Sequence, residues 1–158
     1  MDDPRDDAGL FAAIYPSLRA FAAVTGPVDV EPDDLVQEAV ARTLRTHRLV
    51  DLDDAGAYLR RAIVNLAANR RRSLARFRVA FARLDRVDEG QAPQYDSDWQ
   101  DLLRLHPEDR ALLFIVEVEG ATYAEAAKTL GITEQAARTR AVRARRRLRA
   151  EVEGARDE

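Results

Sequence analysis

Residues 121–149 read ATYAEAAKTLGITEQAARTRAVRARRRLR and contain the strongest local structural signal in the chain. Thr122 and Glu125 have the spacing of a capping box, in which each side chain bonds the backbone N–H of the other residue at a helix start. Gly131 follows the apolar end of that helix and can take the positive φ of a tight turn. Thr133 is a natural N-cap for a second helix. This succession predicts a helix-turn-helix.

The second helix of such a motif places its first turns in the major groove of DNA. Glutamine can pair with adenine and arginine with guanine, whereas arginines further along a helix more often contact phosphates. The residues expected near the bases are Gln135, Arg138, Thr139 and Arg140, and those expected near phosphates are Arg143, Arg145, Arg146 and Arg147. The alternative is a two-helix hairpin whose outer face is basic without binding DNA.

Charge is segregated along the chain, although the net formal charge is only −3. Residues 60–86 hold nine Arg and one Asp, and residues 122–150 hold eight Lys or Arg and two Glu. The stretches 1–57 and 87–121 are acidic. Two basic blocks indicate two surfaces that face polyanions. The alternative is a pair of solvated, arginine-rich helix faces, which like-charge repulsion makes less favourable.

The N-terminal half also has helical rather than period-2 patterning. Residues 10–24 predict an amphipathic helix that Pro16 kinks or splits. A second helix should start at residues 31–34, because proline suits the first helical position and acidic residues suit the positive end of the helix dipole. Its apolar stripe would comprise Leu35, Val36, Ala39, Val40 and Leu44. After a loop at 50–56, a third helix should run from Ala57 and end among residues 69–72.

The fold class that these patterns predict is all-α, with two small helical domains. Residues 86–101 lose helical periodicity and gain glycine, proline and acidic side chains, which predicts a flexible linker. A second helical lobe should begin at residues 106–109, and Gly120 is a plausible C-cap within it. The expected domains are therefore residues 8–85 and 102–152.

The composition excludes several kinds of chemistry. The chain has no cysteine, and its two histidines occur singly, outside any metal-ligand spacing. It also has no Ser-His-Asp set and no phosphate loop, so we expect neither an enzyme, a cofactor nor a metal. No apolar run long enough to span a bilayer is apparent, and the start of the chain is acidic where a signal peptide would be basic. We expect a cytoplasmic protein without membrane insertion.

Beyond these patterns, the chain resembles a known family along most of its length. DLVQE at 34–38 and AYLRRAIVNLA at 57–67 resemble region 2 of the extracytoplasmic-function sigma factors of bacterial RNA polymerase, which belong to the sigma-70 family. LHPEDR at 105–110, VEGATYAEAA at 118–127 and RTRAVRARRRL at 138–148 resemble their region 4. The resemblance covers about residues 10–150, in the family's order.

The resemblance implies a transcription initiation factor that binds core RNA polymerase, through the β′ clamp helices and the β flap, and directs it to promoters. Region 4 would read the −35 duplex, and region 2 would melt the −10 element with the loop at 50–57 and the helix after it. The implied polymerase contacts are Asp34, Gln37 and Glu38. The implied −10 contacts are Arg60, Arg61, Asn65, Asn69, Arg70, Arg71 and Arg72. Asn65 could instead be a polar group that packs inside the helices.

The resemblance also suggests an anti-sigma factor as a further partner. A stand-alone helix-turn-helix regulator is the alternative function, and it would need only the second lobe.

The chain also departs from the family, since Ala126 and Ala136–Ala137 stand where branched residues are usual. We expect these smaller side chains to loosen the helix-turn-helix, by about 1 kcal/mol per lost pair of buried methyl groups.

Overall fold

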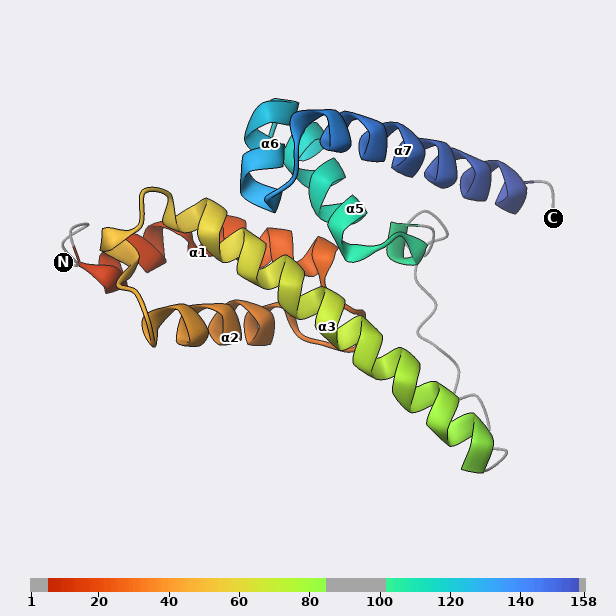
Figure 1. The fold of residues 1–158 in the computed structure, drawn as a ribbon, viewed down its shortest axis with the longest axis horizontal. Coiled ribbons are helices and arrows are strands. Elements are labelled where there is room, and N and C mark those ends of the chain that lie inside the picture. The colour runs from red at the N-terminus through yellow and green to blue at the C-terminus, as the bar shows by residue number, and fades with distance from the viewer. Residues whose placement is uncertain (1–5, 85–101, 157–158) are drawn as a thin grey trace.

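The computed structural model describes residues 6–84 and 102–156, and this part of the chain is helical (Figure 1). The helices are α1 (Asp7–Thr25), α2 (Pro32–Leu44), α3 (Ala55–Leu84), α5 (Pro107–Leu113), α6 (Tyr123–Leu130) and α7 (Glu134–Arg156), with a 3-10 turn η1 (Leu49–Asp51) and a π-helical turn η2 (Phe114–Val118). The predicted all-α class is confirmed for these residues, and the predicted linker at 86–101 lies outside them.

The helix-turn-helix has the local structure that its sequence predicts. At the start of α6, the Thr122 hydroxyl accepts a hydrogen bond from the Glu125 N–H at 3.2 Å, and the Glu125 carboxylate accepts one from the Thr122 N–H at 2.8 Å. Gly131 ends α6 with a φ of 68°, in the left-handed region that favours glycine. The Thr133 hydroxyl then accepts a hydrogen bond from the Ala136 N–H at 3.1 Å, so it caps α7.

The N-terminal helices agree in part with the sequence predictions. α1 is one continuous helix, so Pro16 does not split it. α2 begins at Pro32, as predicted, and Leu35, Val36 and Ala39 are buried. The prediction that Leu44 belongs to the same buried stripe is wrong, because its side chain is 47% exposed at the end of the helix.

The predicted end of α3 among residues 69–72 is also wrong. The helix continues to Leu84, and its far half projects away from the other helices (Figure 1). Residues 73–84 contain neither glycine nor proline and are rich in alanine, leucine and arginine, which are strong helix formers. The arginine cluster at 70–72 is therefore exposed helix surface rather than a terminus.

The N-terminal lobe consists of α1, η1, α2 and α3, with each of the three helices packed on the other two. Leu18, Phe21, Leu35 and Ile63 form its centre and are completely buried. Contrary to the expectation from sequence, α1 has the length and composition of a membrane span. Length and composition are weak grounds for a span, and the burial of Leu18 and Phe21 against the other helices is typical of a core helix.

The C-terminal lobe consists of α5, η2, α6 and α7. Its helix-turn-helix is packed on small side chains, because Ala126, Ala137 and Ala141 are completely buried. Small side chains allow α6 and α7 to approach closely. Gly120, at the end of η2, has a φ of 71°, which is consistent with its expected place at a helix C-terminus.

The two lobes are packed against each other. α5 contacts α1 and α3, and α6 contacts α3 (Figure 1). The ring of Phe21 in α1 meets that of Phe114 in η2 edge-on, with 5.8 Å between centroids. Buried side chains of both lobes form one hydrophobic cluster. The chain therefore has an extensive interface between the lobes, which sequence patterning does not reveal.

Candidate nucleic-acid interface

The start of α7 displays the residues that sequence analysis placed near DNA bases. Gln135 is exposed, and Thr139 lies one helical turn further along, half-buried. Arg138 is held in place by an ion pair with Glu134 at 2.6 Å. The guanidinium carbon of Arg138 also lies over the ring of Tyr123, 5.0 Å from the ring centroid. These side chains form a polar, cationic end of the helix that can meet a groove of DNA.

Two of the other predicted DNA contacts have partners inside the lobe. Arg140 pairs with Glu108 of α5. Arg145 pairs with Glu117 of η2 and donates a hydrogen bond to the hydroxyl of Tyr123 at 2.8 Å. The hydrogen bond to Glu117, and to a smaller extent the one to Tyr123, raises the pKa of Arg145 above its usual value. Both arginines thus brace α7 against the rest of the lobe.

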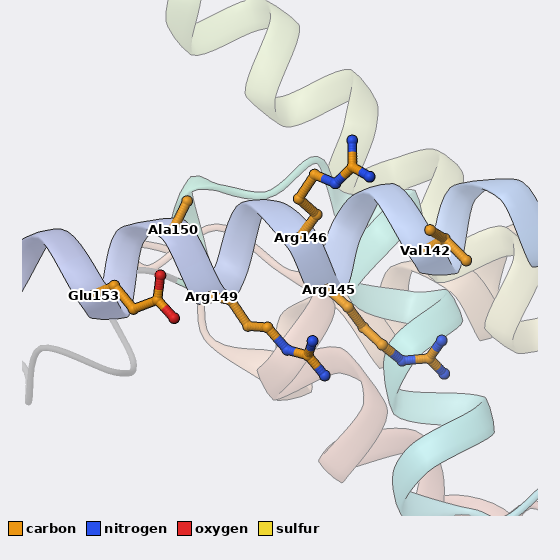
Figure 2. A pocket seen from close by; sticks show the side chains of 6 residues that line it. All are labelled: Val142, Arg145, Arg146, Arg149, Ala150 and Glu153. Atoms are coloured by element: carbon orange, nitrogen blue, oxygen red, sulfur yellow. The ribbon is translucent and has the colours of Figure 1, made fainter.

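A shallow groove of about 520 Å³ runs along the second half of α7. It is lined by Val142, Arg145, Arg146, Arg149, Ala150 and Glu153 (Figure 2). Figure 2 shows Arg145 and Arg149 on one side of the helix and Arg146 on the other. Sequence analysis did not include Arg149 among the DNA contacts, although its spacing of four from Arg145 puts both residues on one helix face. The groove extends the basic surface beyond the turns expected to reach bases.

The second basic surface lies on α3. Arg61, Asn65, Asn69 and Arg72 follow one another at spacings of four, four and three, so they share one helix face, and all four are exposed. The exposure of Asn65 excludes the alternative that it packs inside the bundle. Arg72 donates a hydrogen bond to the side-chain oxygen of Asn69. This face carries amide and guanidinium groups, which suit contacts to bases and phosphates of a single strand.

The predicted polymerase contacts lie together on α2. Asp34 and Gln37 are exposed, and Glu38 is half-buried beside them. The Glu38 carboxylate pairs with Arg42 at 2.6 Å and with Arg70 of α3 at 2.7 Å. The hydrogen bond from Arg70 is the main reason why the pKa of Glu38 lies below its usual value. A residue expected to contact polymerase is thus joined to one expected to contact DNA.

Other polar groups in the lobes have structural roles. A ring nitrogen of His106 accepts a hydrogen bond from the Glu108 N–H at 3.3 Å, so this histidine caps α5. Burial lowers the pKa of His106. Within residues 6–84 and 102–156, no three His, Cys, Asp or Glu side chains are placed to hold a metal ion.

Known proteins are similar to this chain in both lobes. The family model described as "Sigma-70, region 4" matches residues 102–148, which include the whole helix-turn-helix. The co-crystal structure of the sigma factor RpoE with the anti-sigma factor NepR from Bartonella quintana is similar in fold, with a TM-score of 0.69. That similarity covers 92% of this chain and 96% of the other at 20% identity.

The match to sigma-70 region 4 includes α6 and the first half of the basic helix α7. The chain is 28% identical, over 145 residues, to the "ECF RNA polymerase sigma factor SigM" of two Mycobacterium tuberculosis strains, a match that covers 88% of this chain and 73% of the relative. The chain is therefore similar to extracytoplasmic-function sigma factors over most of its length, and residues 102–148 match region 4 of the sigma-70 family.

Proposed function

We propose that this chain is an extracytoplasmic-function sigma factor, which binds core RNA polymerase and divides promoter recognition between its two lobes. Residues 8–85 would act as region 2, residues 102–152 as region 4, and residues 86–101 as the linker. The observation that carries this proposal is the presence, in one chain, of an exposed amide- and arginine-bearing face on α3 and a capped helix-turn-helix. A stand-alone regulator would need only the second of these.

The C-terminal lobe would read the −35 element as duplex DNA. Gln135 and Arg138 lie at the start of α7, where direct contacts to base edges are made. Arg143 and Arg146 are exposed further along the helix and would neutralise phosphates, with Thr139 between the two sets. Arg140 and Arg145 could reach DNA only by sharing or leaving their carboxylate partners. We assign them to positioning α7.

The N-terminal lobe would hold the melted −10 element. Flipping a base out of the duplex costs a few kcal/mol, which stacking, base-edge contacts and phosphate neutralisation must offset. Asn65 and Asn69 offer donors and acceptors for base edges, and Arg61 and Arg72 on the same face offer charge for phosphates. Arg60, Arg70 and Arg71 would complete the set once their present partners are released.

The α2 surface would dock on polymerase. Asp34, Gln37 and Glu38 would contact the β′ clamp helices, while the C-terminal lobe would approach the β flap. An anti-sigma factor is a further proposed partner, and it would act by covering the same surfaces. Because RNA polymerase works in the cytoplasm, we place the protein there.

The test is reconstitution with core RNA polymerase on DNA templates that carry randomised upstream sequence. We expect the chain to co-migrate with core and to support transcripts from a selected subset of templates. Asp34→Lys should weaken co-migration, whereas Glu31→Lys, an equal charge change at the exposed N-cap of the same helix, should not. Tight binding to duplex DNA without binding to core would favour the stand-alone regulator.

A further inference from the structure

One serine of the chain directly follows a run of arginines. Ser73 comes after the three arginines at 70–72 and before Leu74. No other serine or threonine in the sequence has arginine at both the second and the third position before it. Protein kinases select their substrates in part by charge, and a kinase with an acidic substrate groove selects hydroxyl groups that follow basic residues. The sequence around Ser73 has this pattern, and the function proposed above makes no use of its hydroxyl.

The structure leaves Ser73 accessible to such an enzyme. Its side chain is exposed, and it lies where α3 begins to project away from the other helices (Figure 1). Ala68 is buried, but none of the described side chains from residue 69 to residue 79 is. Helices in proteins are stabilised mostly by the packing of a buried face, which this segment lacks. It can therefore open locally, as a kinase requires in order to reach the hydroxyl and the backbone on either side.

Two arginines are placed to receive a phosphate on Ser73. Side chains three positions apart on a helix are neighbours, so Arg70 and Arg76 lie next to Ser73 on its two sides. Both are exposed. A phosphoserine carries a charge of about −1.5 to −2 at pH 7 and three strong acceptor oxygens, and arginine can bind a phosphate through two parallel hydrogen bonds. The phosphate would therefore be held between two guanidinium groups.

The present partner of Arg70 does not prevent this exchange. Arg70 pairs with the Glu38 carboxylate at 2.7 Å, but 45% of the Arg70 side chain remains exposed. Water screens an ion pair that is exposed to this extent, so the pair contributes little to stability. A phosphate with nearly twice the charge of a carboxylate would compete well for the same guanidinium.

Ser73 also borders the surface proposed to hold the melted −10 element. Asn65, Asn69, Arg72 and Arg76 follow one another at spacings of four, three and four, so they share one helix face. Ser73 comes four residues after Asn69 and lies at the edge of that face. A phosphate there would repel the phosphates of a DNA strand and would engage arginines that the strand needs.

We propose that Ser73 is a phosphorylation site and that its phosphate weakens the binding of single-stranded DNA to α3. The γ-phosphoryl group of ATP is transferred by a serine kinase with an acidic substrate groove. The bond from Ser73 Oγ to phosphorus forms while the bond from phosphorus to the β,γ-bridging oxygen breaks, ADP leaves, and the hydroxyl proton passes to a carboxylate of the kinase. The effect on DNA rests on the proposed function, whereas the site itself does not.

The first measurement locates the phosphate in the full chain. The probe is ATP with the catalytic subunit of cyclic-AMP-dependent protein kinase, which has an acidic substrate groove, and mass spectrometry of the intact chain and its peptides is the readout. We expect one phosphoryl group, on Ser73, and none on Ser73→Ala. Arg70→Gln should slow the transfer at least about tenfold, since it removes a charge before the serine, whereas Arg76→Gln, an equal change after the serine, should not. The same peptide analysis of the chain isolated from growing and stationary native cells should find phosphate on Ser73.

The second measurement is fluorescence anisotropy with a random single-stranded oligonucleotide. Loss of two arginine contacts lowers the slope of the logarithm of affinity against the logarithm of salt concentration by about 1.4, at about 0.7 per phosphate contact. The phosphorylated chain should therefore bind about 25-fold more weakly than the unmodified chain at about 0.1 M salt. Ser73→Asp and Ser73→Asn have side chains of equal size that differ by one charge, and Ser73→Asp should bind about fivefold more weakly than Ser73→Asn.

The site would be overturned if the full chain gained no phosphate on Ser73, or if the chain from native cells carried none under either condition. Equal affinities of the phosphorylated and unmodified chains for the oligonucleotide would overturn the effect on DNA. If the unmodified chain did not bind the oligonucleotide although Ser73 was phosphorylated, the result would count against the proposed −10 function and would leave the phosphorylation site established.

Discussion

Replacing Arg110 by methionine should destabilise the protein by about 2–4 kcal/mol. The guanidinium bonds the carbonyl oxygens of Thr25, Gly26, Leu103 and Leu105 at 2.6, 3.1, 2.8 and 3.3 Å. A hydrogen bond from a charged donor contributes about 1.5–3 kcal/mol. The two short bonds, to Thr25 and Leu103, and the two longer and weaker ones, to Gly26 and Leu105, therefore contribute about 6 kcal/mol in total. Against this stands the burial of the charge, which lowers the pKa of Arg110 to about 10 and so costs about 3 kcal/mol.

The loss can be measured by urea unfolding of the full chain, followed by far-UV circular dichroism. Arg110→Lys keeps the charge but not the planar fork of donors, so it should fall between the parent and Arg110→Met. Arg146→Met removes an exposed guanidinium from α7 and should change stability by less than about 0.5 kcal/mol. If Arg110→Met lowered the free energy of unfolding no more than Arg146→Met does, the assignment of Arg110 as the centre of the interface between the lobes would be refuted.

Three further predictions concern the helix-turn-helix and its surroundings. Gly131→Ala and Gly120→Ala both place alanine at a positive φ and should each lose about 1 kcal/mol in the same urea assay. Gly120 has open space around it, and the Arg61 guanidinium beside Gly131 is the end of an exposed, flexible side chain that can move aside. A much larger loss for Gly131→Ala would contradict the freedom of the Arg61 side chain to move aside. Thr122→Ala should lower stability by about 1 kcal/mol, seen as a lower Tm in calorimetry, whereas Thr122→Ser should not; an unchanged Tm would contradict the capping role. Arg143→Ala should weaken the binding of duplex DNA similarly across sequences. It should also reduce by about 1 the slope of the logarithm of affinity against the logarithm of salt concentration, and a sequence-dependent loss of affinity would contradict a phosphate contact.

The features that could be predicted best from the sequence are those that depend on neighbours along the chain. The Thr122–Glu125 capping box, the positive φ of Gly131 and the Thr133 cap each involve residues within three positions of one another. Pro32 at the start of α2 is a similar case. Such features are fixed by backbone geometry and local hydrogen bonding, so they can be recognised from spacing alone.

Features that depend on distant contacts were missed. Arg110 meets carbonyl groups 84 and 85 positions earlier in the chain, and no local pattern indicates that contact. Arg140 and Arg145 were assigned to DNA because sequence shows their charge but not the carboxylates that folding brings to them. The length of α3 was underestimated, because a run of arginines suggested a helix end where strong helix formers continue.

The central claim is that two lobes of one chain read two separate promoter elements for RNA polymerase. The most direct measurement is sequencing of the templates that the reconstituted holoenzyme transcribes from a randomised library, with the parent chain and with Gln135→Ala on α7. We predict two preferred blocks, about 25 base pairs apart, and loss of preference in the upstream block alone for Gln135→Ala. A single block, or transcription that does not depend on adding the chain to core polymerase, would contradict the account.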